Sequence, residues 1–154
     1  MNAFYFDSSS LVKRYLIETG SKWIIGLLKP SAKNTVFVAR ISGVEVVSAV
    51  ARRRKGLSIT QLNAQKAIFR FQRDFRKKFI KTNLTPQLVE EAMRIADKHE
   101  LRAYDAVQLT SAVEANQLRL NNGLSPIVFI SADNHLNSAA QAEGLTVDNP
   151  NNHP

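Results

Sequence analysis

Four carboxylates in this chain stand where predicted strands end or predicted helices begin: Asp7, Glu45, Asp105 and Asp133. Clustered carboxylates repel one another unless a cation compensates their charge. Mg²⁺ and Mn²⁺ prefer oxygen ligands, and such an ion can deliver a bound water to a phosphate and neutralise the charge that develops there. If the four acids meet, the sequence therefore predicts a divalent-cation site that needs no covalent nucleophile.

Each acid also has a simpler explanation. A carboxylate at the start of a helix accepts hydrogen bonds from free backbone amides and complements the helix dipole. This explanation serves for any one of the four acids. It is less satisfactory for four acids at matching junctions, so both interpretations are carried forward.

The apolar pattern predicts strands that alternate with helices. Strands are expected at residues 3–6, 35–38, 79–82, 127–130 and 145–147. Helices are expected at residues 8–16, 21–28, 42–55, 60–77, from 85 onward, 104–120 and 134–143. This order predicts an α/β fold with a central, mainly parallel sheet of about four to five strands and helices on both faces. Ligand sites in such sheets lie outside the carboxyl ends of the strands, where the acids are expected.

Length and composition narrow the possibilities. A chain of 154 residues suits one domain, which we expect to span residues 1–148 and to be followed by a frayed tail at 149–154. The sequence has no cysteine, which excludes disulfides and thiolate metal sites. It shows no signal-peptide pattern at its start and no apolar run near the roughly 20 residues of a membrane span. We therefore expect a cytoplasmic protein with no membrane partner.

The charge is strongly basic. There are 21 Lys and Arg residues against 13 Asp and Glu residues, a formal net charge of +8. Such an excess favours polyanionic partners, either nucleic acid or acidic protein, although it also fits an ordinary solvated surface.

Four segments resemble one known family, in that family's order: 5–15, 44–49, 104–109 and 129–133. They are similar to PIN-domain proteins, especially the VapC-type toxins of bacterial toxin–antitoxin pairs, and 136–145 is similar to the family's closing helix and strand. The resemblance covers about residues 3–147. It implies a single PIN-like domain that acts as a metal-dependent endoribonuclease.

The resemblance also implies roles for individual residues. Asp7 and Asp105 would be the principal ligands of Mg²⁺ or Mn²⁺, while Glu45 and Asp133 would complete the shell through water or orient the attacking water. All four would be catalytic.

Hydroxyl positions of the family match Ser8 and Ser131, which would support the site by hydrogen bonding. His135 stands where some members have a further acid, which puts a tightly bound second metal in question.

Candidate RNA contacts come from two helices. Lys66, Arg70, Arg73 and Lys77 fall on one stripe of the predicted helix 60–77. Such a stripe can track an RNA backbone, and it can equally be a solvated face. Two further candidates, Arg52 and Arg53, end the helix that carries Glu45, where cations also complement the helix dipole.

Partners follow from the resemblance as well. VapC-type toxins act on RNA, commonly form homodimers and pair with a small cognate antitoxin whose tail covers the acidic pocket, often with an inserted Arg. The main alternative is a noncatalytic basic module that binds RNA or protein and has a degenerate metal site. A phosphatase with Asp7 as covalent nucleophile is a third reading, but Ser9 stands where such enzymes need a second acid.

Overall fold

One five-stranded sheet forms the centre of the molecule. The computed structural model describes residues 2–154. The strands are β1 (Ala3–Phe6), β2 (Thr35–Ala39), β3 (Ile80–Thr82), β4 (Ile127–Ile130) and β5 (Thr146–Asp148). All neighbouring pairs are parallel, in the order β3-β2-β1-β4-β5. The chain therefore builds outward from β1 in both directions, which creates a topological switch point beside β1. The predicted α/β fold with a parallel sheet is confirmed.

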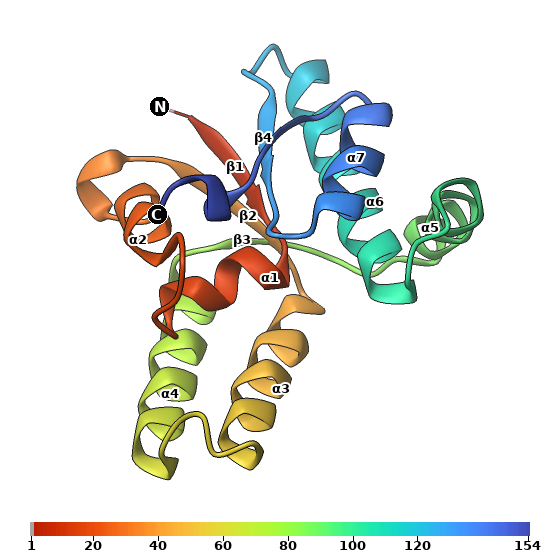
Figure 1. Cartoon of the computed structure of the whole chain (residues 1–154). Coiled ribbons are helices and arrows are strands. Elements are labelled where there is room, and N and C mark those ends of the chain that lie inside the picture. The colour runs from red at the N-terminus through yellow and green to blue at the C-terminus, as the bar shows by residue number, and fades with distance from the viewer. Residues whose placement is uncertain (1) are drawn as a thin grey trace.

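Helices cover both faces of this sheet (Figure 1). One layer contains α1 (Ser8–Leu11), α2 (Ser21–Leu27), α3 (Ser42–Lys55) and α4 (Gln61–Lys77), together with the 3-10 helices η1 (Val12–Arg14) and η2 (Pro30–Ala32). The other layer contains α5 (Pro86–His99), α6 (Ala103–Asn121) and α7 (Asn134–Ala142). Between residues 2 and 154, no helix is both long and apolar enough to cross a membrane.

The strands supply one apolar core to each layer. Phe4 and Phe6 pack with the α1–α4 layer, whereas Ala3 and Tyr5 pack with the α5–α7 layer. This alternation follows from the two-residue period of a strand, which sends successive side chains to opposite faces. Because both faces of β1 are buried, the strand is apolar throughout until Asp7.

Side-chain caps fix where several helices begin. Asp7 caps α1 by accepting from the Ser10 amide, and Asp133 caps α7 by accepting from the Leu136 amide. Thr60 and Thr85 cap α4 and α5 in the same way. Two of the four predicted acids are therefore helix caps, as the simpler interpretation expects, and capping does not prevent them from sharing a pocket.

The C-terminal segment departs from expectation. Residues 149–154 are not a frayed tail, because Pro150–Asn152 forms a 3-10 helix, η3, beside α2 (Figure 1). The His153 ring stacks on Trp23 with ring centroids 4.0 Å apart, and its Nε2 lies 2.8 Å from Asp148 Oδ1. Pro150 is buried, and a side chain at Gly20 would clash with its carbonyl oxygen. These contacts hold the segment against α2 and bury Asn149 and Pro150, although Asn151, Asn152 and Pro154 remain exposed.

Candidate active site

A pocket of about 440 Å³ opens beside the carboxyl end of β1, and all four predicted acids line it. They arrive from four separate segments: the β1–α1 junction, the first turn of α3, the first turn of α6 and the cap of α7. Arg52 and Arg102 line the same pocket. The topology thus brings together residues that lie far apart in sequence.

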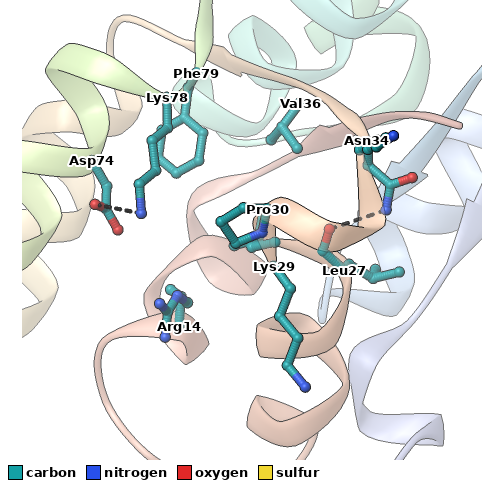
Figure 2. Close-up of a pocket in the computed structure, with 11 residues that line it drawn as sticks. Arg14, Leu27, Lys29, Pro30, Asn34, Val36, Asp74, Lys78 and Phe79 are labelled. Atoms are coloured by element: carbon teal, nitrogen blue, oxygen red, sulfur yellow. Dashed lines mark hydrogen bonds and ion pairs between the residues drawn. The ribbon is translucent and has the colours of Figure 1, made fainter. Parts of the chain in front are cut away.

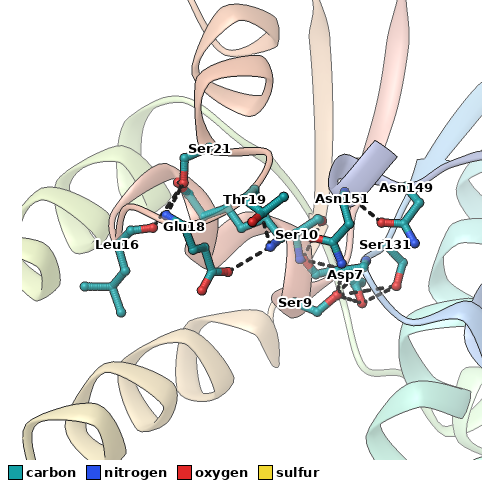
Figure 3. A network of polar contacts seen from close by, with 12 residues as sticks. Asp7, Ser9, Ser10, Leu16, Glu18, Thr19, Ser21, Ser131, Asn149 and Asn151 are labelled. Carbon is teal, nitrogen blue, oxygen red and sulfur yellow. Dashed lines mark hydrogen bonds and ion pairs between the residues drawn. The ribbon is translucent and has the colours of Figure 1, made fainter. Parts of the chain in front are cut away.

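Asp7 is the most buried acid of the pocket, with 3% of its surface exposed. Both of its carboxylate oxygens accept from the Ser9 hydroxyl at 2.8 Å, and Oδ2 also accepts from the Ser131 hydroxyl at 2.8 Å (Figure 3). Oδ1 accepts from the Ser10 amide at 2.9 Å. Burial raises the pKa of Asp7, and these hydrogen bonds oppose the rise. Within residues 2–154 no cation pairs with this carboxylate.

Glu45 is held from two sides. The Ser8 hydroxyl donates to Oε2 at 3.0 Å, and Gln108 Nε2 donates to Oε1 at 2.6 Å. Burial raises the pKa of Glu45, these two hydrogen bonds oppose the rise, and the charges of Asp7 and Asp105 add to it. These two contributions show that the Glu45 carboxylate is close enough to Asp7 and Asp105 to be repelled by both.

Gln108 is a site residue that sequence reasoning missed. Its side chain is buried, and its Oε1 accepts from the Tyr5 hydroxyl at 2.9 Å. Nε2 donates to Ser42 Oγ at 2.9 Å as well as to Glu45. Because the Tyr5 hydroxyl donates to the amide oxygen, the amide nitrogen must face Glu45. The available signal was position: Gln108 follows Asp105 by three residues, which places both on the same side of α6.

Asp105 and Asp133 complete the acidic lining, and both are partly buried. Burial and the nearby charge of Asp133 raise the pKa of Asp105, while Arg102 acts in the opposite direction. The Ser131 hydroxyl accepts from the Asp133 amide at 3.1 Å, so one hydroxyl links the Asp7 and Asp133 segments. The predicted supporting hydroxyls therefore contact site acids, Ser131 at Asp7 and Ser8 at Glu45, and Ser9 joins them.

The four carboxylates that line the pocket are chemically suited to bind a hard cation. All four acids offer oxygen, the ligand atom that Mg²⁺ and Mn²⁺ prefer, and Mg²⁺ usually keeps several waters between itself and a protein site. The acids are not tightly grouped, however: in the part of the chain that the structure describes, no three Asp, Glu or His side chains are close enough to hold one ion together. A cation would have to be bound partly through water or with some closing of the pocket.

The predicted RNA contacts divide into three groups. Arg53 is ion-paired with Glu18, and Arg73 Nη2 lies 3.2 Å from Asp74 Oδ1. These two cations are partly neutralised within the chain. Arg52 instead lines the acidic pocket. The remaining three candidates lie exposed along α4: Lys66, Arg70 and Lys77.

Solved structures share this architecture. The chain aligns with PAE2754 from Pyrobaculum aerophilum (TM-score 0.61, 17% identity, 98% of this chain and 91% of that one). It aligns with VapBC2 from Rickettsia felis bound to a promoter DNA fragment (0.62, 10%, 96% and 98%) and with a toxin–antitoxin complex from Klebsiella pneumoniae (0.59, 17%, 96% and 97%). At these identities the likeness concerns the fold, which is that of PIN-domain proteins.

Relatives in sequence show the family as well as the fold. Ribonuclease VapC45 and Ribonuclease VapC49 of Mycobacterium tuberculosis are each 30% identical to this chain over 150 residues, which cover 96% of this chain and 95% of each relative. No protein-family model matches the sequence. Because the identity extends over nearly the full length of both partners, the chain belongs to the VapC family of ribonucleases.

Proposed function

We propose that this protein is a Mg²⁺- or Mn²⁺-dependent endoribonuclease that hydrolyses RNA phosphodiester bonds and acts as the toxin of a toxin–antitoxin pair. One observation carries the proposal: acids from four separate segments line a single pocket beside the switch point of the sheet. Membership of the VapC family supports the ribonuclease activity.

In this mechanism Asp7 and Asp105 would be the principal ligands of the metal ion, while Glu45 and Asp133 would bind it through water or orient the attacking water. When bound, such an ion would lower the pKa of a water and neutralise charge on the phosphate. The Ser9 and Ser131 hydroxyls fix the Asp7 carboxylate in one orientation. With its pKa raised by burial, Glu45 is suited to take a proton from the attacking water.

Two cations in the same pocket are suited to the substrate. Arg52 and Arg102 line the pocket, and a guanidinium can hold a phosphate through two parallel hydrogen bonds. We assign to them the binding of the phosphates that flank the scissile bond. This arrangement lets an acidic pocket accept a polyanion, because the Arg side chains attract the backbone that the carboxylates alone would repel.

An antitoxin partner is part of the proposal. Two of the structural neighbours are VapBC2 from Rickettsia felis and a toxin–antitoxin complex from Klebsiella pneumoniae. A small cognate antitoxin that inserts an Arg into the pocket would form charge-assisted hydrogen bonds with the four acids and block RNA. We also propose that the protein forms a homodimer, as its family commonly does.

The test is cleavage of structured RNA with Mg²⁺ or Mn²⁺. We expect cleavage that both EDTA and Asp7→Asn abolish, because Asp7 is the most buried ligand and Asn removes its charge. Asp97→Asn is the matched control: Asp97 is an exposed acid of α5 outside the pocket, and cleavage should be unchanged.

Full cleavage by Asp7→Asn would refute the mechanism. RNA binding without any metal-dependent cleavage would favour the noncatalytic module instead. That alternative is consistent with the absence of a tight three-acid group within residues 2–154.

A further inference from the structure

The cations are concentrated in one part of the chain. Residues 1–82 contain 17 of the 21 Lys and Arg residues but only 4 of the 13 acids, whereas residues 83–154 contain 4 cations and 9 acids. The first segment forms the α1–α4 layer and the second forms the α5–α7 layer. One layer is therefore strongly basic and the other is acidic, an asymmetry that the net charge of +8 conceals. A polyanion is attracted to the first layer and repelled by the second.

A cavity of about 220 Å³ lies within the basic layer (Figure 2). Four cations line it: Arg14, Lys29, Lys33 and Lys78. Its apolar wall is built by Leu27, Leu28, Pro30, Val36 and Phe79. The cavity is beside the amino end of β2, whereas the acidic pocket begins just beyond the carboxyl end of that strand. The two sites therefore lie at opposite ends of β2.

Most of the cations that line the cavity have no ion-pair partner among residues 2–154. Lys78 is paired with Asp74, whose Oδ1 lies 3.0 Å from Nζ. Arg14, Lys29 and Lys33 have no ion-pair partner among residues 2–154. Three unpaired cations around an apolar wall are complementary to a ligand with an anionic group and a flat or apolar body.

Size and surroundings distinguish between ligands of that kind. Pockets for free small ligands usually exceed about 300 Å³, so this cavity suits one unit of a longer chain better than a separate molecule. Further exposed cations, Lys66, Arg70 and Lys77, lie on α4, the helix whose Asp74 lines the cavity. An extended row of cations fits a polymer with a charge on every unit.

We propose that this cavity binds one nucleotide of the RNA, remote from the cleavage pocket, with its base against Leu28 and Phe79 and its phosphate at Arg14, Lys29 and Lys33. Sequence-tolerant binding of this kind combines a cationic groove with apolar or aromatic contact to a base. The inference rests on the proposed function, since it identifies RNA as the ligand. It adds a second contact that holds the RNA across the basic layer while the acidic pocket cleaves it.

The test is RNA binding without cleavage. Affinity of a single-stranded RNA of about 20 nucleotides is measured by fluorescence anisotropy in EDTA, on the Asp7→Asn background, over a series of salt concentrations. Lys29→Glu combined with Lys33→Glu should weaken binding about tenfold or more and make the salt dependence shallower, because phosphate contacts are lost. Leu28→Trp, which fills the cavity without changing charge, should weaken binding several-fold and leave the salt dependence unchanged.

The matched control is Arg54→Glu combined with Lys55→Glu, at the end of α3 and outside the cavity. It alters the net charge by the same amount, and we expect a clearly smaller loss of affinity. Equal losses in the two charge-reversal variants, or wild-type RNA affinity in Leu28→Trp with an unchanged unfolding temperature, would overturn the inference. The inference would also be overturned if the cavity variants lost affinity for an acidic peptide but kept wild-type affinity for RNA.

The outcomes separate the two proposals. If Asp7→Asn abolishes metal-dependent cleavage but the cavity variants bind RNA normally, the proposed function stands and the cavity assignment fails. If the cavity variants lose RNA binding but no metal-dependent cleavage is found, the protein binds RNA at this cavity and the nuclease assignment fails.

Discussion

Asp7 and Asp74 are equally buried carboxylates, with 3% and 2% of their surfaces exposed, yet their surroundings are opposite. Asp7, in the acidic pocket, accepts from serine hydroxyls and a backbone amide only. Asp74, beside the basic cavity, is paired with Lys78 and Arg73 and accepts from the Tyr15 hydroxyl at 3.2 Å.

The difference appears in their pKa values. Burial acts to raise the pKa of both groups, and it prevails at Asp7. At Asp74 the cations outweigh burial, so its pKa lies below the ordinary value. Burial alone therefore does not set the pKa of a carboxylate, because its hydrogen-bond and ion-pair partners also contribute. The charge of Asp74 is compensated inside the chain, whereas Asp7 has no cationic partner among residues 2–154 and is free to interact with the metal ion or antitoxin Arg that we propose.

The sharpest test of this contrast is stabilisation by metal. Mn²⁺ at about 100 times its dissociation constant should raise the free energy of unfolding of the wild type by about 2.7 kcal/mol. The reason is that the ion compensates a buried charge that the fold leaves uncompensated. Asp7→Asn should lose this response and Asp74→Asn should keep it, as measured by denaturant unfolding with and without Mn²⁺. The same Mn²⁺ response in all three proteins would remove the distinction between the two carboxylates.

A second test concerns the partner that holds Glu45. Gln108→Leu should lower Mn²⁺ affinity and cleavage about 10- to 100-fold, because groups that orient metal ligands typically have effects of this size. Isothermal titration with Mn²⁺ is the decisive measurement, since a purely structural defect would alter the unfolding temperature without weakening the metal site of the folded protein. Thr110→Val is a suitable control on the same helix: its buried hydroxyl only donates to the backbone oxygen of Ala106. Unchanged Mn²⁺ affinity in Gln108→Leu would show that Ser8 alone positions Glu45.

What the sequence could predict depends on how local each feature is. The strand-end acids, the helix caps and the parallel sheet follow from short patterns, and the predicted fold is confirmed. Gln108 could not be recognised as a partner of Tyr5 and Glu45, because 103 residues separate it from the first and 63 from the second. Likewise, Arg73 matched the exposed stripe of α4, and only the structure shows that its guanidinium donates to the buried carboxylate of Asp74 at 3.2 Å.

Stability should respond to the two carboxylates with opposite sign. Asp74→Asn should lower the free energy of unfolding by roughly 1.5 kcal/mol at neutral pH, because it removes charge-assisted hydrogen bonds to a buried group whose cationic partners can still reach solvent. Asp7→Asn should leave stability unchanged or raise it slightly in metal-free buffer, since Asn can still accept from the Ser10 amide and no longer buries a charge. Both values come from urea unfolding at one pH. Destabilisation of both variants to the same degree would mean that hydrogen-bond geometry outweighs charge at these positions.

The smallest effect is the pH dependence of those differences, and its sign follows from the pKa shifts. Both acids have an ordinary pKa of 3.8. Because the folded pKa of Asp74 is lowered, its stabilising contribution is complete above 3.8 and is lost as the pH falls through the lower folded value. The folded pKa of Asp7 is raised, so the protonated form favours folding, and that contribution, complete below 3.8, is lost as the pH rises through the raised value. In metal-free urea unfolding, the deficit of Asp74→Asn should therefore shrink toward low pH, while any advantage of Asp7→Asn should grow toward neutral pH. Parallel pH profiles for wild type and both variants would show that neither carboxylate changes its proton affinity on folding.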